Sequence, residues 1–118
     1  MMRLRADIFA AALIRRCAAE GASAVLARRG AAEAGAIFIV VDRLDGRAAL
    51  FGPAPQDELG EAQARGIERL WRRMHKDEWS APGEIAARLV KEIRFDPDLW
   101  IIEIEDRRGR VFFDLAGG

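Results

Sequence analysis

The first twenty residues carry apolar side chains at the spacing of an amphipathic helix. Four of them recur every three or four positions and form one stripe: Ala6, Ala10, Leu13 and Cys17. This spacing predicts a helix over residues 4–20, ended by Gly21. Residues 23–29 then predict a short strand. Because Cys17 lies on the apolar stripe, we expect a buried core cysteine rather than a nucleophile.

The clearest β signal lies between residues 36 and 51. The run 36–41 is β-branched and aromatic, and a second apolar run, 48–51, follows the dipeptide Asp45-Gly46. Two such runs joined by an Asp-Gly turn predict a β-hairpin. Both faces of the first run are apolar, which predicts a central strand covered on both sides. One cover would be a helix and the other a second protomer.

The middle of the chain is less periodic. Residues 56–66 are polar and contain two glycines, so we expect a mobile loop there. Residues 67–74 fit a helix by composition and a strand by alternation, and the residues alone leave both open. A second helix is predicted from Ser80 to Phe95, because a proline suits its first turn and Ile85, Leu89 and Ile93 form a stripe.

The end of the chain predicts a second hairpin. Residues 100–105 and 110–115 are apolar runs on either side of the turn 106–109. The register that pairs every apolar side chain sets Trp100 against Leu115, Ile102 against Phe113, Ile104 against Val111, and Glu105 against Arg110.

These elements define one α+β domain over residues 1–118. We expect a mainly antiparallel β-sheet of about five to six strands with two main helices, in the order α-β-β-β-β-α-β-β. At 51% hydrophobic and 32% charged, the 118 residues are typical of a globular chain. A single cysteine excludes an internal disulfide and suits the cytoplasm. No apolar run is long enough to span a membrane, and zero net charge disfavours nucleic acid as a partner.

No motif for catalysis or for a cofactor stands out. The glycines form neither a phosphate-binding loop nor a dinucleotide fingerprint. His75, the only histidine, lies in a polar stretch that reads as solvated surface, without a companion motif. We therefore expect no catalytic residue, no cofactor and no metal site, and we favour a protein that is not an enzyme.

Two groups of residues are nevertheless candidates for a site. If 67–74 is a strand, Arg69, Trp71 and Arg73 share a face that could stack a nucleobase and bind phosphate; the alternative is an edge strand protected by charge. An acidic cluster of Asp96, Asp98 and Glu103 could bind a cation or act as an acid–base pair. The simpler interpretation is a proline turn followed by a glutamate on a solvated face.

Four stretches of the sequence resemble a family of small alphaproteobacterial proteins catalogued as a domain of unknown function. They are RLRADIFAAALIRRC at 3–17, GAIFI at 35–39, LFGPAPQ at 50–56 and RFDPDLWIIEIEDR at 94–107. The resemblance implies a strand near 67–74 and implies no activity.

The sequence thus favours a cytoplasmic binding or interaction module, expected to be a homodimer through an apolar sheet surface. The alternative is a small-ligand or nucleotide-binding protein that uses Trp71 and the nearby arginines.

Overall fold

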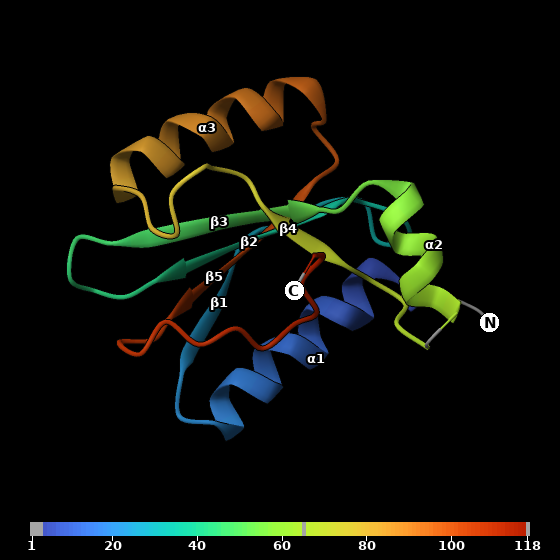
Figure 1. The fold of residues 1–118 in the computed structure, drawn as a ribbon, viewed down its shortest axis with the longest axis horizontal. Coiled ribbons are helices and arrows are strands. Elements are labelled where there is room, and N and C mark those ends of the chain that lie inside the picture. Colours follow the sequence, from blue (N-terminus) through green and yellow to red (C-terminus); the bar gives the residue numbers. More distant parts are fainter. Residues whose placement is uncertain (1–3, 65, 118) are drawn as a thin grey trace.

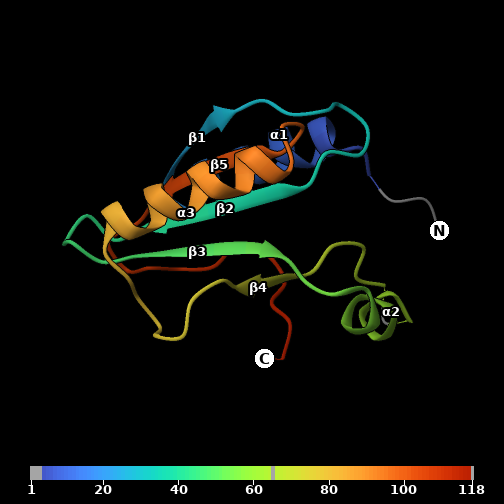
Figure 2. The same ribbon diagram turned by 90° about the horizontal axis from the view of Figure 1, so that it is seen from above.

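A five-stranded sheet lies between two long helices in the computed structural model, which describes residues 4–64 and 66–117 (Figure 1). Helices α1 and α3 cover opposite faces of the sheet, and the shorter α2 lies beside it (Figure 2). The elements are α1 (Ala6–Ala19), β1 (Ser23–Arg28), β2 (Ile37–Asp42), β3 (Ala48–Pro53), α2 (Gln56–Ala64), β4 (Trp71–Arg73), α3 (Pro82–Phe95) and β5 (Trp100–Glu105). Within the described residues, no helix is long and apolar enough to cross a membrane.

The strands run in the spatial order β1-β5-β2-β3-β4. Neighbouring strands are antiparallel except β2 and β5, which run parallel. The prediction of a mainly antiparallel α+β fold is therefore confirmed. β5 comes last in the chain, yet it lies inside the sheet between β1 and β2.

The first hairpin forms as its sequence predicts. Asp42 at the end of β2 faces Ala48 at the start of β3, and the Arg43 N–H donates to the Arg47 carbonyl at 3.0 Å. Gly46 has a φ of 84° in this turn, a left-handed conformation that glycine adopts without strain. The local turn chemistry thus fixes the register of β2 and β3.

Apolar side chains fill both faces of the sheet. On one face, Ile37, Ile39 and Val41 of β2 pack in the core with the apolar stripe of α1, which includes Cys17. On the other, Phe38 and Val40 pack in a smaller core with Ile85, Leu89 and Ile93 of α3. β2 is therefore central and covered on both sides, as predicted. Both covers are helices of this chain, so a second protomer is not what covers that face.

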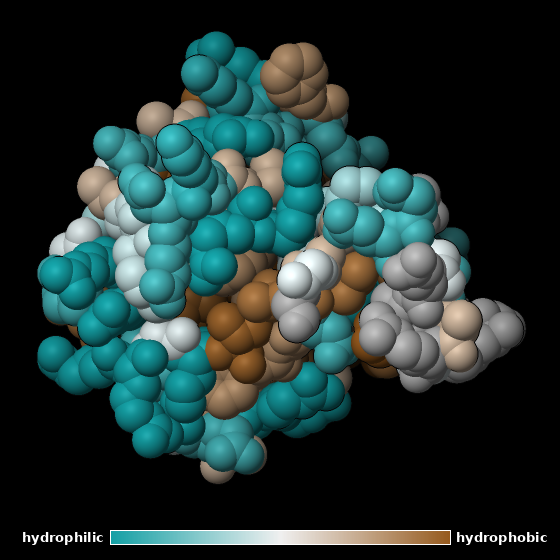
Figure 3. All heavy atoms as spheres, in the orientation of Figure 1, coloured by the Kyte–Doolittle hydropathy of each residue, from teal (hydrophilic) through white to brown (hydrophobic). Residues whose placement is uncertain are grey.

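The predicted closing hairpin is wrong. β5 pairs with β1 and β2, so neither of its edges is open to residues 110–115. The Asp106 carboxylate accepts the Arg110 N–H at 2.8 Å and binds the Arg110 guanidinium, which turns the chain away from β5. The residues beyond it, including Phe113, instead pack against the α1-side core. Apolar side chains gather there in the middle of the face drawn in Figure 3.

Two predictions in the middle of the chain also change. The expected mobile loop at 56–66 contains α2, whose first turn carries Asp57 and Glu58 at the positive end of the helix dipole. Leu59 anchors α2 by packing against Leu70. The strand expected at 67–74 is confirmed only over Trp71–Arg73. The element order is therefore α-β-β-β-α-β-α-β.

Candidate binding groove beside the open sheet edge

The two edges of the sheet differ in what covers them. At the β4 edge, the backbone N–H of Trp71 donates to the Asp114 carbonyl at 2.9 Å, and the backbone N–H of Ala116 donates to the Trp71 carbonyl at 2.7 Å. The C-terminal segment therefore continues the sheet there. At the other edge, no strand of the described residues pairs with the outer side of β1. β1 is thus the open edge.

The hydrogen bonds of β5 show which backbone groups of β1 face outward. The backbone N–H of Trp100 donates to the carbonyl of Ala36, just before β2. The backbone N–H of Asp106 donates to the carbonyl of Asp42, at the end of β2. Peptide groups alternate in direction along a strand, so the even-numbered residues of β5 bond toward β2 and the odd-numbered residues bond toward β1.

Glu103 of β5 faces Val25 of β1, so these two residues exchange the inward hydrogen bonds. The alternate residues Ala24 and Leu26 consequently direct their N–H and C=O groups away from the sheet. A β-bulge between Leu26 and Arg28 interrupts the ladder beyond this point. The side chains of Val25 and Leu26 are 55% and 36% exposed. This edge therefore offers unpaired backbone groups next to exposed apolar side chains.

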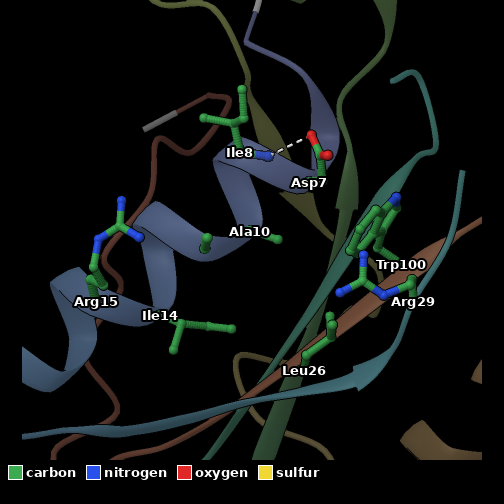
Figure 4. Close-up of a pocket in the computed structure, with 9 residues that line it drawn as sticks. Asp7, Ile8, Ala10, Ile14, Arg15, Leu26, Arg29 and Trp100 are labelled. Carbon is green, nitrogen blue, oxygen red and sulfur yellow. Dashed lines mark hydrogen bonds between the residues drawn. The ribbon is translucent and has the colours of Figure 1, made fainter. Parts of the chain in front are cut away.

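A groove of about 450 Å³ lies between α1 and this edge (Figure 4). Its lining residues are Asp7, Ile8, Ala10, Ala11, Ile14, Arg15, Leu26, Arg29 and Trp100. Figure 4 shows Ile14 and Leu26 reaching into the gap from the helix and the strand, with Arg29 beside the ring of Trp100. The volume is within the usual range of ligand pockets.

The orientation of α1 opens this groove toward β1. One flank of the helix faces β4 and the C-terminal segment: the Phe9 ring centroid lies 5.0 Å from that of Trp71, and Arg16 donates to the Phe112 carbonyl at 2.9 Å. Ile14 projects from the opposite flank because it is offset from Arg16 by about 200° around the helix. The small side chains of this flank leave room above the strand.

The groove carries positive charge. The Arg29 guanidinium carbon lies 5.3 Å from the centroid of the Trp100 ring. Within the described part of the chain, neither Arg29 nor Arg15 forms an ion pair with a carboxylate. The Asp7 carboxylate is held by Arg5 at 3.2 Å, and this hydrogen bond lowers the pKa of Asp7. The two groove arginines remain available to an anion.

The first predicted site lies mostly inside the protein. Trp71 is 2% exposed, its Nε1 donates to the Ile37 carbonyl at 2.8 Å, and its ring packs against two phenylalanine rings. Arg69 and Arg73 each lie over a core phenylalanine ring, at 5.3 and 4.9 Å. The cavity beside Arg69 and Trp71 is only about 40 Å³. The arrangement leaves no open face of Trp71 on which a nucleobase could stack.

The acidic cluster is divided between two places. The Asp96 carboxylate accepts the Asp98 N–H at 3.0 Å, which makes the proline turn of the simpler interpretation. Glu103 lies further along β5, opposite Val25 and Val40. Among the described residues, no three acidic, histidine or cysteine side chains come together to hold a metal ion.

His75 and Cys17 have structural surroundings. His75 Nε2 accepts the Leu50 N–H at 3.0 Å, and Nδ1 lies 2.7 Å from the Asp77 carbonyl oxygen. This histidine therefore joins a loop to β3, whereas its sequence context predicted solvated surface. Cys17 is fully buried, as predicted, and burial raises the pKa of its thiol.

The sequence reasoning missed the groove because its residues come from three distant segments. Arg15 and Arg29 were indistinguishable from other surface arginines, and only the strand order shows that Leu26 lies at an open edge. The one available signal was the pair of apolar residues, Val25 and Leu26, in a short strand.

The fold and the groove define a class: a small α+β sheet protein with one open edge strand beside a cationic apolar groove. The chain belongs to the family described as "Protein of unknown function (DUF1491)", which matches residues 4–114. This confirms the family resemblance seen in the sequence. A search of the curated proteins found no match.

Solved structures of relatives share the fold. A crystal structure of a DUF1491 family protein from Caulobacter crescentus is 36% identical, with a TM-score of 0.76 over 98% of this chain and all of that one. An NMR structure of a family protein from the same organism is 38% identical, with a TM-score of 0.78 over 99% of this chain and all of that one. A solution structure from A. tumefaciens is 43% identical, with a TM-score of 0.73 over 88% of this chain and 86% of that one.

Proposed function

We propose that this chain is a non-enzymatic, cytoplasmic interaction module that binds an extended segment of another protein as an added strand on β1. The open edge carries this proposal: Ala24 and Leu26 direct backbone groups outward, beside two exposed apolar side chains. Strand addition to such an edge gives affinity through the main chain and specificity through alternate side chains. A single free and buried cysteine, Cys17, fits the cytoplasm.

The contrast between the edges supports the choice of β1. The β4 edge already has residues 114–116 beside it, and Arg72 and Arg73 add charge. At β1, the bulge and Arg28 limit pairing at one end only. Residues 23–26 are therefore the segment whose backbone a partner strand would pair with.

Charge favours a different protein over a second copy of this chain. A second β1, with the sequence SAVLAR, contains no carboxylate and would bring further arginines toward Arg15 and Arg29. The homodimer expected from the sequence stays a prediction, and its original reason, an uncovered sheet face, no longer applies because α3 covers that face.

The variant Ala24→Pro tests strand addition directly. Proline removes the outward N–H of Ala24 and leaves the β1–β5 ladder intact, so we expect a melting temperature within a few degrees of wild type. Val25→Pro is the matched control, because it removes an inward hydrogen bond and should destabilise the fold. Peptides selected by wild type from a displayed library of random nine-residue sequences should lose binding to Ala24→Pro.

Three outcomes would overturn the proposal. Strand addition would be refuted if the selected peptides bind folded Ala24→Pro with the same affinity as wild type. It would also be refuted if the selection yields no binder. A wild-type protein that sediments as a dimer, and becomes a monomer when Ala24 is replaced by proline, would show that a second copy occupies the edge.

A further inference from the structure

We infer that the added segment carries an apolar side chain and a carboxylate two positions apart, both directed into the groove between α1 and β1. This inference rests on the proposed strand addition and specifies the partner's chemistry. It follows from the spacing, shape and charge of the groove.

The spacing comes from the bulge in β1. Leu26 faces Ile102 and Arg28 faces Ile101, so Arg29 follows next to Trp100, and the ring contact agrees with this placement. Leu26 and Arg29 therefore lie beside β5 residues that are two positions apart, which corresponds to a separation of about 7 Å along the strand. Side chains two apart on an added strand have the same separation and point to the same face.

The Leu26 end of the groove is apolar. Ile14 of α1 lies across from Leu26, and the groove has room for a side chain between the helix and the strand (Figure 4). An apolar side chain from the added strand would cover Leu26, which otherwise remains 36% exposed. Burial of that surface favours an aliphatic residue here.

The Arg29 end of the groove is cationic. Packing on Trp100 orients the Arg29 guanidinium, and no carboxylate of the described residues neutralises it. Arg15 adds a second positive charge at the other end of the groove, beyond Ile14 on α1 (Figure 4). A carboxylate can accept two parallel N–H bonds from a guanidinium, which selects glutamate or aspartate at this position.

Designed peptides test this pairing by amide chemical-shift titration. The capped peptide KTSVTETTK places its valine and glutamate on one face, KTSVETTTK places them on opposite faces, and KTSVTQTTK replaces the carboxylate by an amide. We expect the first peptide to shift the amides of Ala24, Leu26 and Arg29. The second and third should bind about tenfold more weakly, as expected for loss of one charge-assisted contact.

A pair of arginine variants assigns the effect to the groove. In Arg29→Gln, the glutamate and glutamine peptides should bind equally. Arg107→Gln removes the same charge from an exposed turn and should retain the tenfold preference.

The outcomes separate this inference from the proposed function. Equal binding of all three peptides at β1, abolished by Ala24→Pro, would refute the acidic–apolar pairing and leave strand addition standing. A preference for the first peptide that persists in Ala24→Pro would refute strand addition and keep the groove chemistry. No shift with any peptide would overturn the pairing, and the library selection would then decide strand addition alone.

Discussion

Asp106 joins the turn after β5 to the end of α1 through Arg110. Its carboxylate accepts the Arg110 N–H at 2.8 Å, Nε at 3.1 Å and Nη2 at 3.0 Å. Arg110 Nη2 also donates to the Glu20 carbonyl at 3.0 Å. Asp106 is 7% exposed, so these contacts replace most of its hydration. This cluster sends the C-terminal segment across α1 instead of back along β5.

Replacement of Asp106 by asparagine keeps the size and one acceptor but removes the charge. Hydrogen bonds to a charged group contribute about 1.5–3 kcal/mol, and the Arg110 side chain remains 28% exposed, which favours the lower part of this range. We expect the free energy of unfolding to fall by about 2 kcal/mol, or about 8 °C in melting temperature. Asp77→Asn, at an exposed carboxylate, should change it by less than about 0.5 kcal/mol.

The pH dependence provides a second test. The hydrogen bonds from Arg110 lower the pKa of folded Asp106 below its ordinary value of 3.8. The stabilisation is therefore complete above the unfolded pKa and disappears as pH falls through the folded pKa. Urea unfolding near pH 7, pH 5 and pH 2.5 should show a difference in unfolding free energy between wild type and Asp106→Asn that narrows only at the lowest pH. A gap under about 0.5 kcal/mol at pH 7, or one that stays constant with pH, would refute this reasoning.

Two further predictions concern single hydrogen bonds and close packing. His75→Ala should lower the free energy of unfolding in urea by about 1–3 kcal/mol, because the Leu50 N–H loses its acceptor. Wild-type ¹⁵N spectra should show the neutral imidazole with its hydrogen on Nδ1, and a hydrogen on Nε2 would contradict this. Gly35→Ala should destabilise, since a Cβ there would lie 2.8 Å from the Trp100 ring, whereas Gly60→Ala meets open space within α2 and should stabilise by about 0.5–1 kcal/mol. Equal melting temperatures for the two alanine variants would contradict the packing.

Locally encoded elements were predictable from the sequence. The Asp45-Gly46 turn fixes the β2–β3 hairpin, and the apolar stripes of α1 and α3 identify the sides that pack on the sheet. α2 was missed because the two glycines of segment 56–66 and its polar residues outweighed the acidic first turn and Leu59.

Partners that are distant in sequence were not predictable. The apolar pattern of residues 110–115 fits β5 as well as the patterns of β1 and β2 do. Alternation alone therefore cannot decide whether β5 forms a hairpin with 110–115 or inserts between β1 and β2. The open edge and its groove follow from that insertion. Trp71 illustrates the same difficulty, because its neighbouring arginines suggested an exposed platform, whereas Phe9 and Phe113 enclose its ring.

The position of β5 has a consequence for synthesis on the ribosome. β1 joins the sheet only through β5, which lies between β1 and β2, so the nascent chain cannot complete its sheet before residue 105 has left the exit tunnel. Until then, β1 and one side of β2 offer unpaired apolar strands to chaperones and to other chains. A stop codon in α3 would therefore release an aggregation-prone fragment rather than a smaller stable protein.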